Sequence, residues 1–211
     1  MLDAKYLPWL KVALFIAALA PLARLVLFGV TDRLGANPIE FITRSTGTWT
    51  LAFLLITLSV TPLRRLSGWH SLIKLRRMFG LFAFFYSCLH FTTYIWLDQF
   101  FDLASIYKDV IKRPFITVSF PSFLLMILLA ITSTNAMLRR LGAKRWQHLH
   151  RLVYVIAIGG VVHYLWLVKK GVTDPLIYAV ILVLLLAYRL VVAVRKRRSS
   201  TGTKKIATVN A

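Results

Sequence analysis

Histidines are the side chains in this 211-residue sequence whose types and positions point most directly to chemistry. His90 and His163 each lie deep inside a long apolar stretch, whereas His148 and His150 lie at the start of the stretch that contains His163. His70 lies among basic residues and is expected to be solvated. A titratable side chain inside an apolar, membrane-type segment costs free energy, so it indicates a function such as binding a metal or a cofactor.

Six apolar stretches must hold these histidines in place. About 20 mainly apolar residues are needed to cross a hydrocarbon core of roughly 30 Å, and 58% of this chain is hydrophobic. The stretches have no alternating pattern typical of strands, and the connections between them are short. The sequence therefore predicts an all-α integral membrane protein. Its six-transmembrane-helix bundle is expected at residues 9–28, 48–63, 79–97, 114–135, 150–168 and 175–194.

Basic residues indicate the orientation of the bundle. Lys and Arg number 27 against 7 Asp and Glu, a formal net charge of +20. They gather in connections 64–78 and 138–151 and in the tail, while connections 29–47 and 98–113 are nearly balanced. The positive-inside rule then places both termini in the cytoplasm. A nucleic-acid-binding module would be basic but far less apolar, so the expected partner of this charge is membrane lipid, with no nucleic acid.

The two ends of the chain carry separate expectations. Ala18-Leu19-Ala20 resembles a signal-peptide cleavage site, but the adjacent Pro21 should block cleavage, so the first stretch is expected to remain as a helix. Residues 1–198 are expected to form the transmembrane domain. Residues 199–211 lack an apolar face and are expected to be a disordered cytoplasmic tail.

The two buried histidines are predicted to reach the same level of the bilayer. His90 follows Arg77 by 13 residues, His163 follows His150 by 13 residues, and both helices enter from the basic side. At 1.5 Å per residue, each histidine lies about 20 Å into the membrane. Two imidazoles at one level, on the third and fifth helices, suit the axial ligation of a b-type haem from both of its faces.

Small residues accompany both histidines, within one helical face or one helical turn. They are Gly80, Ala83 and Ser87 on the third helix, and Gly159 and Gly160 on the fifth. Taken alone, such residues are more typical of close helix packing in membranes. Combined with the matched histidines, they favour a bulky, flat ligand such as haem.

Other kinds of site fit the sequence less well. Cys88 is the only cysteine, which excludes a disulfide framework and any Cys-based cluster. A zinc site needs three or four ligands, and a Ser–His–Asp hydrolase needs an acid that the apolar stretches lack. A small membrane transporter or scaffold with structural histidines remains open as an alternative.

Longer motifs around the histidines resemble a known family. They are residues 75–81 (LRRMFGL), 88–94 (CLHFTTY), 132–137 (TSTNAM), 146–154 (WQHLHRLVY) and 163–166 (HYLW). From the first helix to the sixth, the chain resembles the MsrQ family, the haem-binding membrane subunits of bacterial periplasmic methionine sulfoxide reductase systems. This family belongs with the ferric-reductase-like transmembrane proteins.

The resemblance implies an inner-membrane protein that holds b-type haem between its third and fifth helices, and FMN has also been associated with the family. Such a subunit takes electrons from a cytosolic flavin reductase or the quinol pool. It passes them to a periplasmic molybdopterin-containing methionine sulfoxide reductase, which repairs oxidised proteins. The chain is therefore expected to be an electron-transfer subunit without catalytic residues. A stand-alone transmembrane ferric reductase is the alternative among redox proteins.

The resemblance also assigns the iron ligands, which correspond to His90, His150 and His163. His150 is the open case, because helical geometry favours His148 as the residue on the side of His163. Two-haem relatives carry a second histidine on the third helix, where this chain has arginines. An inner haem would therefore be ligated by His150 alone or be absent.

The arginines in question are Arg76 and Arg77, both candidate cofactor-binding residues. Arg76 lies on the same helical face as His90, and its guanidinium suits a haem propionate or a flavin phosphate. The alternative is that both arginines serve only the topology of the membrane protein and contact lipid headgroups.

Overall fold

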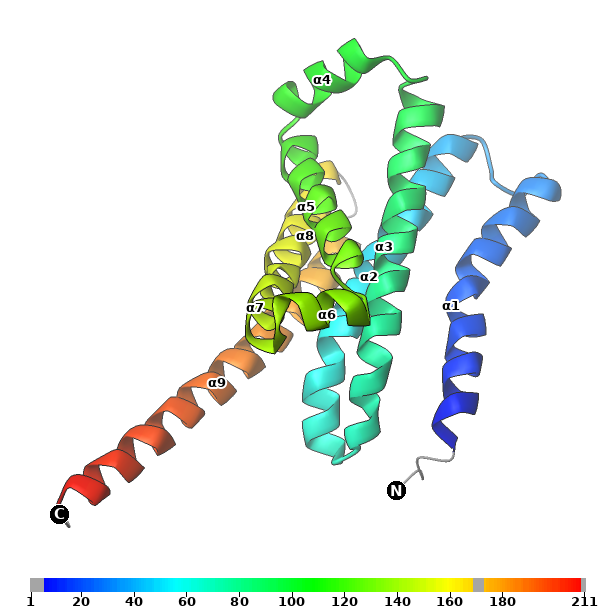
Figure 1. Ribbon diagram of the computed structural model, residues 1–211. Helices are drawn as coiled ribbons and strands as arrows, with labels where there is room; N and C mark the ends of the chain where they lie inside the picture. Colours follow the sequence, from blue (N-terminus) through cyan, green and yellow to red (C-terminus); the bar gives the residue numbers. More distant parts are fainter. Residues whose placement is uncertain (1–5, 169–172, 210–211) are drawn as a thin grey trace.

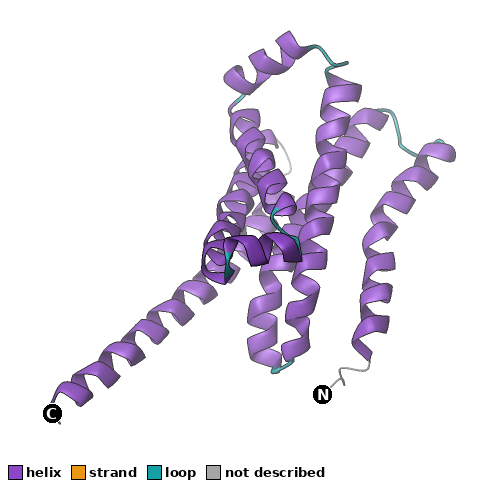
Figure 2. Ribbon diagram, viewed as in Figure 1, coloured by secondary structure: helices purple, strands orange, loops and turns teal. Residues whose placement is uncertain are grey.

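Helices make up nearly all of the structure (Figure 2). The computed structural model describes residues 6–168 and 173–209, with side chains up to Arg195, and these ranges contain helices and turns but no strand. The α-helices are α1 (Leu7–Val30), α2 (Pro38–Ser67), α3 (Arg76–Thr92), α4 (Leu103–Lys112), α5 (Pro114–Ile131), α6 (Asn135–Leu141), α7 (Ala143–Leu149), α8 (Val153–Leu167) and α9 (Thr173–Val209). Three shorter helices adjoin them: the 3₁₀ turns η2 (His70–Leu75) and η4 (His150–Leu152) and the π-helical η3 (Thr93–Asp98).

Six helical segments are long and apolar enough to cross a membrane, which confirms the predicted six-helix membrane fold. They are Leu7–Val30, Pro38–Ser67, His70–Asp98, Pro114–Ile131, Ala143–Leu167 and Thr173–Arg195. Of the remaining helices, α4 lies at one end of the bundle, and α6 runs across it next to the end of α5 (Figure 1).

The second span begins ten residues earlier than the sequence pattern predicted. Helix α2 starts at Pro38, and the side chain of Asn37 caps it by accepting a hydrogen bond from the backbone of Glu40 at 3.2 Å. Proline in the first turn after an Asn cap is a favourable helix start. The helix ends at Ser67 and is capped by Gly68, whose φ of 68° favours a residue without a side chain. Most of the predicted connection 29–47 is therefore helical and brings extra residues to the site.

The core lies where α2 packs along α3, with α5 packed along α8 beside them (Figure 1). Phe53 of α2 stacks against three rings of α3 at centroid distances of 5.4–6.4 Å. Leu58, Ala83, Tyr86 and Ala157 have no exposed surface, so α2, α3 and α8 are in close contact. These helices form the rigid frame on which the candidate site is built.

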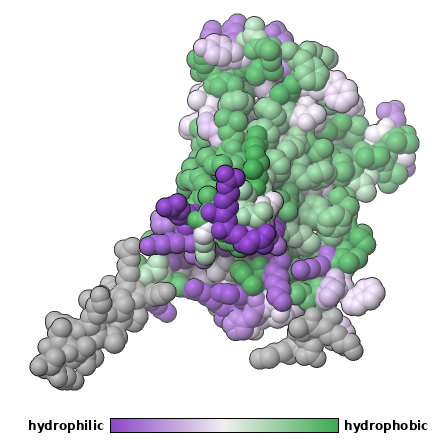
Figure 3. Space-filling view, in the orientation of Figure 1, coloured by the Kyte–Doolittle hydropathy of each residue, from purple (hydrophilic) through white to green (hydrophobic). Residues whose placement is uncertain are grey.

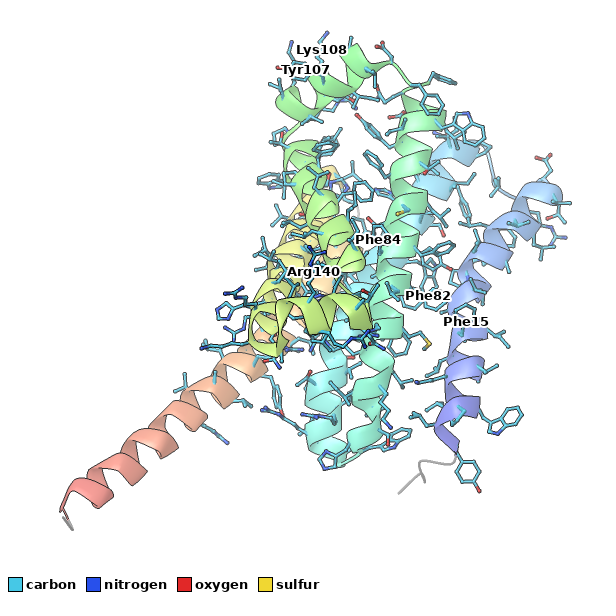
Figure 4. The ribbon with its side chains drawn as sticks, viewed as in Figure 1. Phe15, Phe82, Phe84, Tyr107, Lys108 and Arg140 are labelled. Carbon is cyan, nitrogen blue, oxygen red and sulfur yellow. The ribbon has the colours of Figure 1, made fainter. Side chains whose placement is uncertain are left out.

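Helix α1 is attached to this frame through the fully buried Tyr86. Its hydroxyl donates to the carbonyl of Ala18 at 2.8 Å and accepts from the backbone of Leu22 at 3.2 Å. Both partners belong to one turn of α1 around Pro21, where the proline already interrupts the helical hydrogen bonds. Phe15 adds an edge-to-face contact with Phe82 of α3 at 5.1 Å, visible in Figure 4.

Helix α9 is attached through an arginine within its membrane-spanning part. Pro62 has no N–H, so the carbonyl of Leu58 in α2 lacks its usual helical donor. Arg189 donates to this carbonyl at 2.7 Å and to the hydroxyl of Tyr154 at 2.6 Å. A guanidinium in apolar surroundings needs such acceptors, and here it links α9 to both α2 and α8.

The two ends of the bundle differ in charge. Hydrophobic surface covers most of its length, and hydrophilic side chains gather around α6 and α7 (Figure 3). We call this the basic end, because it carries Arg64, Arg65, Lys74, Arg139, Arg140, Lys144 and Arg145. Helix α1 begins and helix α9 ends on the side of the basic end. Helix α4 lies at the opposite end, which we call the α4 end (Figure 1). Residues 199–211 were predicted to form a disordered tail. Their side chains lie outside the described residues, so the tail and the domain boundary at residue 198 both stay predictions.

Candidate functional site

His90 and His163 face each other across the bundle. Their ring centroids are 6.2 Å apart, and the ring planes are 79° from parallel. His90 lies in the last turn of α3, and His163 lies in the last two turns of α8. The helices run in the same direction from the basic end, so equal rise brings both side chains to one level.

Each imidazole is oriented by a backbone carbonyl from a neighbouring helix. Nδ1 of His90 lies 3.0 Å from the carbonyl oxygen of Thr43 in α2, and Nδ1 of His163 lies 2.8 Å from that of Phe115 in α5. A carbonyl can only accept, so Nδ1 is the protonated nitrogen in both rings. The unprotonated Nε2 of each ring is then free to bind a metal, the arrangement usual for metal-binding histidines.

A cavity of about 310 Å³ lies beside the two rings, between α2, α3, α5 and α8. This volume is typical of a small-molecule or cofactor site. The wall is mainly apolar and aromatic, and it includes Gly47, Ser87, Ser122 and Gly160. We call it the histidine-pair cavity.

Gly47 of α2 is the small residue that makes room for His90. A Cβ atom at this position would lie 3.0 Å from Cε1 and 3.1 Å from Nδ1 of the imidazole. Such distances are shorter than nearly all real contacts of a Cβ atom. The absence of a side chain at residue 47 is therefore a condition for the observed position of His90.

The small residues singled out in the sequence mainly serve helix packing. A Cβ atom at Gly80 would contact Thr57 of α2, and one at Gly159 would collide with Ser122 of α5. Ala83 is fully buried in the core. Only Ser87 and Gly160 of this set also line the histidine-pair cavity.

His150 lies in a second cavity, of about 520 Å³, toward the basic end. Its described lining contains Arg76, Arg77 and Arg151 and no carboxylate, and we call it the arginine cavity. Arg77 also donates to the side chain of Asn135 at 2.7 Å. A group of cations that lines a cavity without acids is suited to an anionic ligand.

Trp146 and Thr132 hold the His150 ring. The indole of Trp146 stacks on the imidazole at a centroid distance of 3.9 Å and donates to the carbonyl of Thr132 at 2.8 Å. The hydroxyl of Thr132 lies 3.2 Å from Nε2 of His150. The sequence pattern alone did not indicate this role of Trp146.

The choice between His150 and His148 depended on helical geometry that the chain does not follow. The 3₁₀ turn η4 separates α7 from α8, so a constant 100° per residue does not hold between residues 148 and 163. His148 is exposed on α7 and lines neither cavity, as is also true of His70 in η2. The role of His150 as an iron ligand stays a prediction.

The two cavities share part of their walls. Leu54 of α2, Met126 of α5 and Ile156 of α8 line both of them. A single apolar layer therefore separates a site at the basic end from the histidine pair nearer the α4 end. Such short spacing suits the transfer of electrons between two cofactors.

A bare metal ion fits the histidine pair poorly. Within residues 6–168 and 173–195, no group of three or more His, Cys, Asp and Glu side chains is arranged to hold a metal. A metal that is already bound within a planar macrocycle needs only two ligands from the protein, one on each face of the macrocycle. The paired imidazoles match that requirement.

Sequence reasoning missed several residues of the site. Thr43, Gly47 and Arg44 were assigned to a loop, although the Asn37-Pro38 helix start signals that α2 includes them. Phe115 gave no signal, because a backbone carbonyl acts through its position alone.

The chain matches the family model described as "Ferric reductase like transmembrane component" over residues 43–161. This range includes His90, the described lining of the arginine cavity and most of the lining of the histidine-pair cavity, and it ends two residues before His163.

Several curated proteins are similar over nearly their whole length. One from Herminiimonas arsenicoxydans is 62% identical over 196 residues, which cover 92% of this chain and 89% of that protein. One from Azospira oryzae is 57% identical, covering 88% and 80%, and one from Bordetella pertussis is 50% identical, covering 93% and 96%. Each is named "Protein-methionine-sulfoxide reductase heme-binding subunit MsrQ".

Proposed function

The chain belongs to the MsrQ family of ferric-reductase-like transmembrane proteins, and on this premise we propose that it binds b-type haem and relays electrons across a bacterial inner membrane. The observation that carries the proposal is the pair of facing imidazoles, His90 and His163, on α3 and α8. Both are assigned as axial ligands of the haem iron.

The geometry of the pair fits an iron atom between two rings. Metal–imidazole bonds of about 2 Å, with about 1 Å more from nitrogen to ring centre on each side, give a centroid separation of roughly 6 Å. The observed 6.2 Å agrees with that sum. The Nδ1–carbonyl hydrogen bonds and the space left by Gly47 support the same assignment, because they fix the rings with Nε2 available.

Haem, when bound, supplies a centre that takes up and releases one electron at a time. This chain's own residues orient the ligand rings, line the cavity with apolar side chains and keep bulk water from it. In this proposal the chain is an electron-transfer subunit, and a separate protein turns over the substrate.

The arginine cavity is proposed to hold a second electron carrier. His150 is its candidate iron ligand, and Arg76 and Arg77 are its candidate partners for a propionate or a phosphate. An inner haem with His150 as its protein ligand and FMN bound by its phosphate are the two candidates. The shared wall with the histidine-pair cavity makes either one a source of electrons for the outer haem.

The distribution of charge supports a direction for the relay. The basic end would face the cytoplasm, where a flavin reductase or the quinol pool donates electrons. The α4 end would face the periplasm, where a molybdopterin-containing methionine sulfoxide reductase accepts them. The acceptor must be a separate protein, because the segments at the α4 end are too short to form an enzyme.

Absorption and EPR spectra of the purified protein test the proposal. We expect a red protein with a low-spin haem signal, and replacement of His90 or His163 by Ala should abolish most of it. His150→Ala should leave that signal in place, and the exposed His70→Ala is the matched control. A wild-type spectrum in both the His90→Ala and His163→Ala proteins would show that the ligands are misassigned.

A further inference from the structure

Two arginines line the histidine-pair cavity near its α4 end, Arg44 of α2 and Arg113 at the start of α5. Each is close in sequence to the carbonyl that orients a histidine. Arg44 directly follows Thr43, which holds His90, and Arg113 precedes Phe115, which holds His163, by two residues. The backbone of each arginine is therefore next to the segment that orients one imidazole.

Each arginine also forms an ion pair with the acidic residue four positions earlier. Arg44 bonds Glu40 through Nη2 at 2.8 Å, and Arg113 bonds Asp109 through Nε at 3.1 Å. A guanidinium has five N–H donors, so one such bond leaves most of them for another acceptor. In Arg113 both terminal Nη groups lie outside the ion pair.

Asp109 accepts hydrogen bonds from more side chains than Glu40 does. It is 7% exposed and lies on α4, whose residues Tyr107 and Lys108 point away from the bundle (Figure 4). Its Oδ1 accepts from Arg113, and its Oδ2 accepts from the Tyr94 hydroxyl and the Gln99 amide, both at 3.2 Å. A buried carboxylate with three donors is held in one place, and it holds Arg113 in turn.

One further charge lies at this end of the cavity. Asp98 also lines it and accepts from the Gln99 amide at 3.2 Å. Glu40 and Asp109 pair with the arginines but do not line the cavity, so its described wall presents two guanidinium groups and one carboxylate. Guanidinium groups bind carboxylates and phosphates through paired, charge-assisted hydrogen bonds.

We propose that Arg44 and Arg113 bind the two propionate carboxylates of the haem, and that Asp109 is a positioning residue for Arg113. This rests on the haem site proposed above. The carboxylates are part of the same molecule as the iron, so they must lie close to it, and Arg44 and Arg113 are the cations in the described wall of the cavity that both imidazoles line. The propionate edge of the haem then faces the α4 end, where its electron leaves.

Reconstitution of the apoprotein with two forms of haem tests the assignment. One form is haem itself, and the other is haem dimethyl ester, in which both carboxylates are blocked. The affinity ratio of haem to ester is measured for wild type, Arg44→Gln, Arg113→Gln and Asp109→Asn. The ester is more apolar than haem for every protein, so this difference cancels when the ratios of two proteins are compared. Lys108→Gln, on the outward side of α4, is the matched control for loss of a charge.

The affinity ratio of haem to ester should be at least about tenfold higher in wild type and in the Lys108→Gln control than in either arginine variant. Asp109→Asn should lower the ratio as well, while its low-spin spectrum persists. Arg44 is largely exposed, so its variant is expected to fold even if the Arg113 variant does not. A ratio equal to wild type in the Arg44→Gln protein and in any folded Arg113→Gln protein would overturn the assignment. Failure of haem itself to give a low-spin spectrum would instead overturn the haem site, and the propionate assignment with it.

Discussion

Replacement of Gly47 by Ala tests the packing of α2 against His90 by adding a single methyl group. The new Cβ would lie 3.0 Å from Cε1 and 3.1 Å from Nδ1, where 3.4–4 Å is ordinary contact. The imidazole must therefore move by a few tenths of an ångström. That movement weakens its 3.0 Å hydrogen bond to the carbonyl of Thr43 and turns Nε2 away from the iron.

The expected loss is confined to the cofactor. A hydrogen bond of this kind contributes roughly 1 kcal/mol, so haem should bind about fivefold more weakly from this effect alone. Ala is about 1 kcal/mol more favourable than Gly inside a helix, so the stability of the apoprotein should not fall. The weaker binding therefore reports on the position of His90 rather than on general unfolding.

Gly80→Ala is the matched control, because Gly80 is also inside a helix and its Cβ would meet Thr57 at an ordinary 3.7 Å. Haem affinity and the low-spin EPR signal are measured for both variants, with thermal unfolding of the apoproteins alongside. Gly47→Ala should lose affinity and change the signal, while Gly80→Ala keeps the signal of the histidine pair. Equal behaviour of the two variants would refute the role assigned to Gly47.

Four other predictions follow from the contacts and charges of the bundle. Arg189→Leu should lower the unfolding free energy by about 1–3 kcal/mol, because it leaves a carbonyl of α2 unpaired. Adding Pro62→Ala should recover part of that loss in thermal unfolding, and full additivity of the two changes would contradict the link. Trp146→Phe keeps a ring beside His150 but loses the indole N–H, so a spectral signal of the arginine cavity should shift while that of the histidine pair does not. Cysteines engineered between α1 and α2, or ahead of α4, should react with an impermeant reagent from the periplasm; reaction only after the cytoplasm is opened would invert the relay. Reduced protein should be reoxidised rapidly by a periplasmic molybdopterin methionine sulfoxide reductase with its substrate, and equal reoxidation by sulfoxide alone would exclude the relay.

The number of spans, the family and the levels of His90 and His163 could all be predicted from the sequence. Apolar stretches long enough to cross a membrane are a local property of the chain, as is the constant rise of a helix. Thirteen residues from each basic boundary were therefore enough to predict two histidines at one depth, and the structure brings these rings to 6.2 Å. The motifs around them were enough to recognise the MsrQ family.

Boundaries that depend on capping and on irregular turns were less predictable. The second span was expected at 48–63 because Glu40 and Arg44 interrupt the apolar run, yet both belong to α2. The direction of His150 relative to His163 could not be worked out from a constant helical repeat, because the 3₁₀ turn η4 interrupts that repeat. Charged residues can belong to a helix beyond its apolar stretch, and a short turn can change the direction of the side chains that follow it.

The tertiary structure alone decided how the site is built. Thr43 and Phe115 act through carbonyl oxygens, which every residue possesses, so nothing in their side chains marks them. Gly47 faces His90 only because α2 crosses α3 at that level, and Asp109 reaches Arg113 and Tyr94 only because α4 folds back over the end of the bundle. These contacts join residues that are distant in the chain or act through the backbone, and such pairings leave no periodic trace in a single sequence. A local pattern can place a histidine at a depth, but the packing of neighbouring helices determines which nitrogen it offers and what lies beside it.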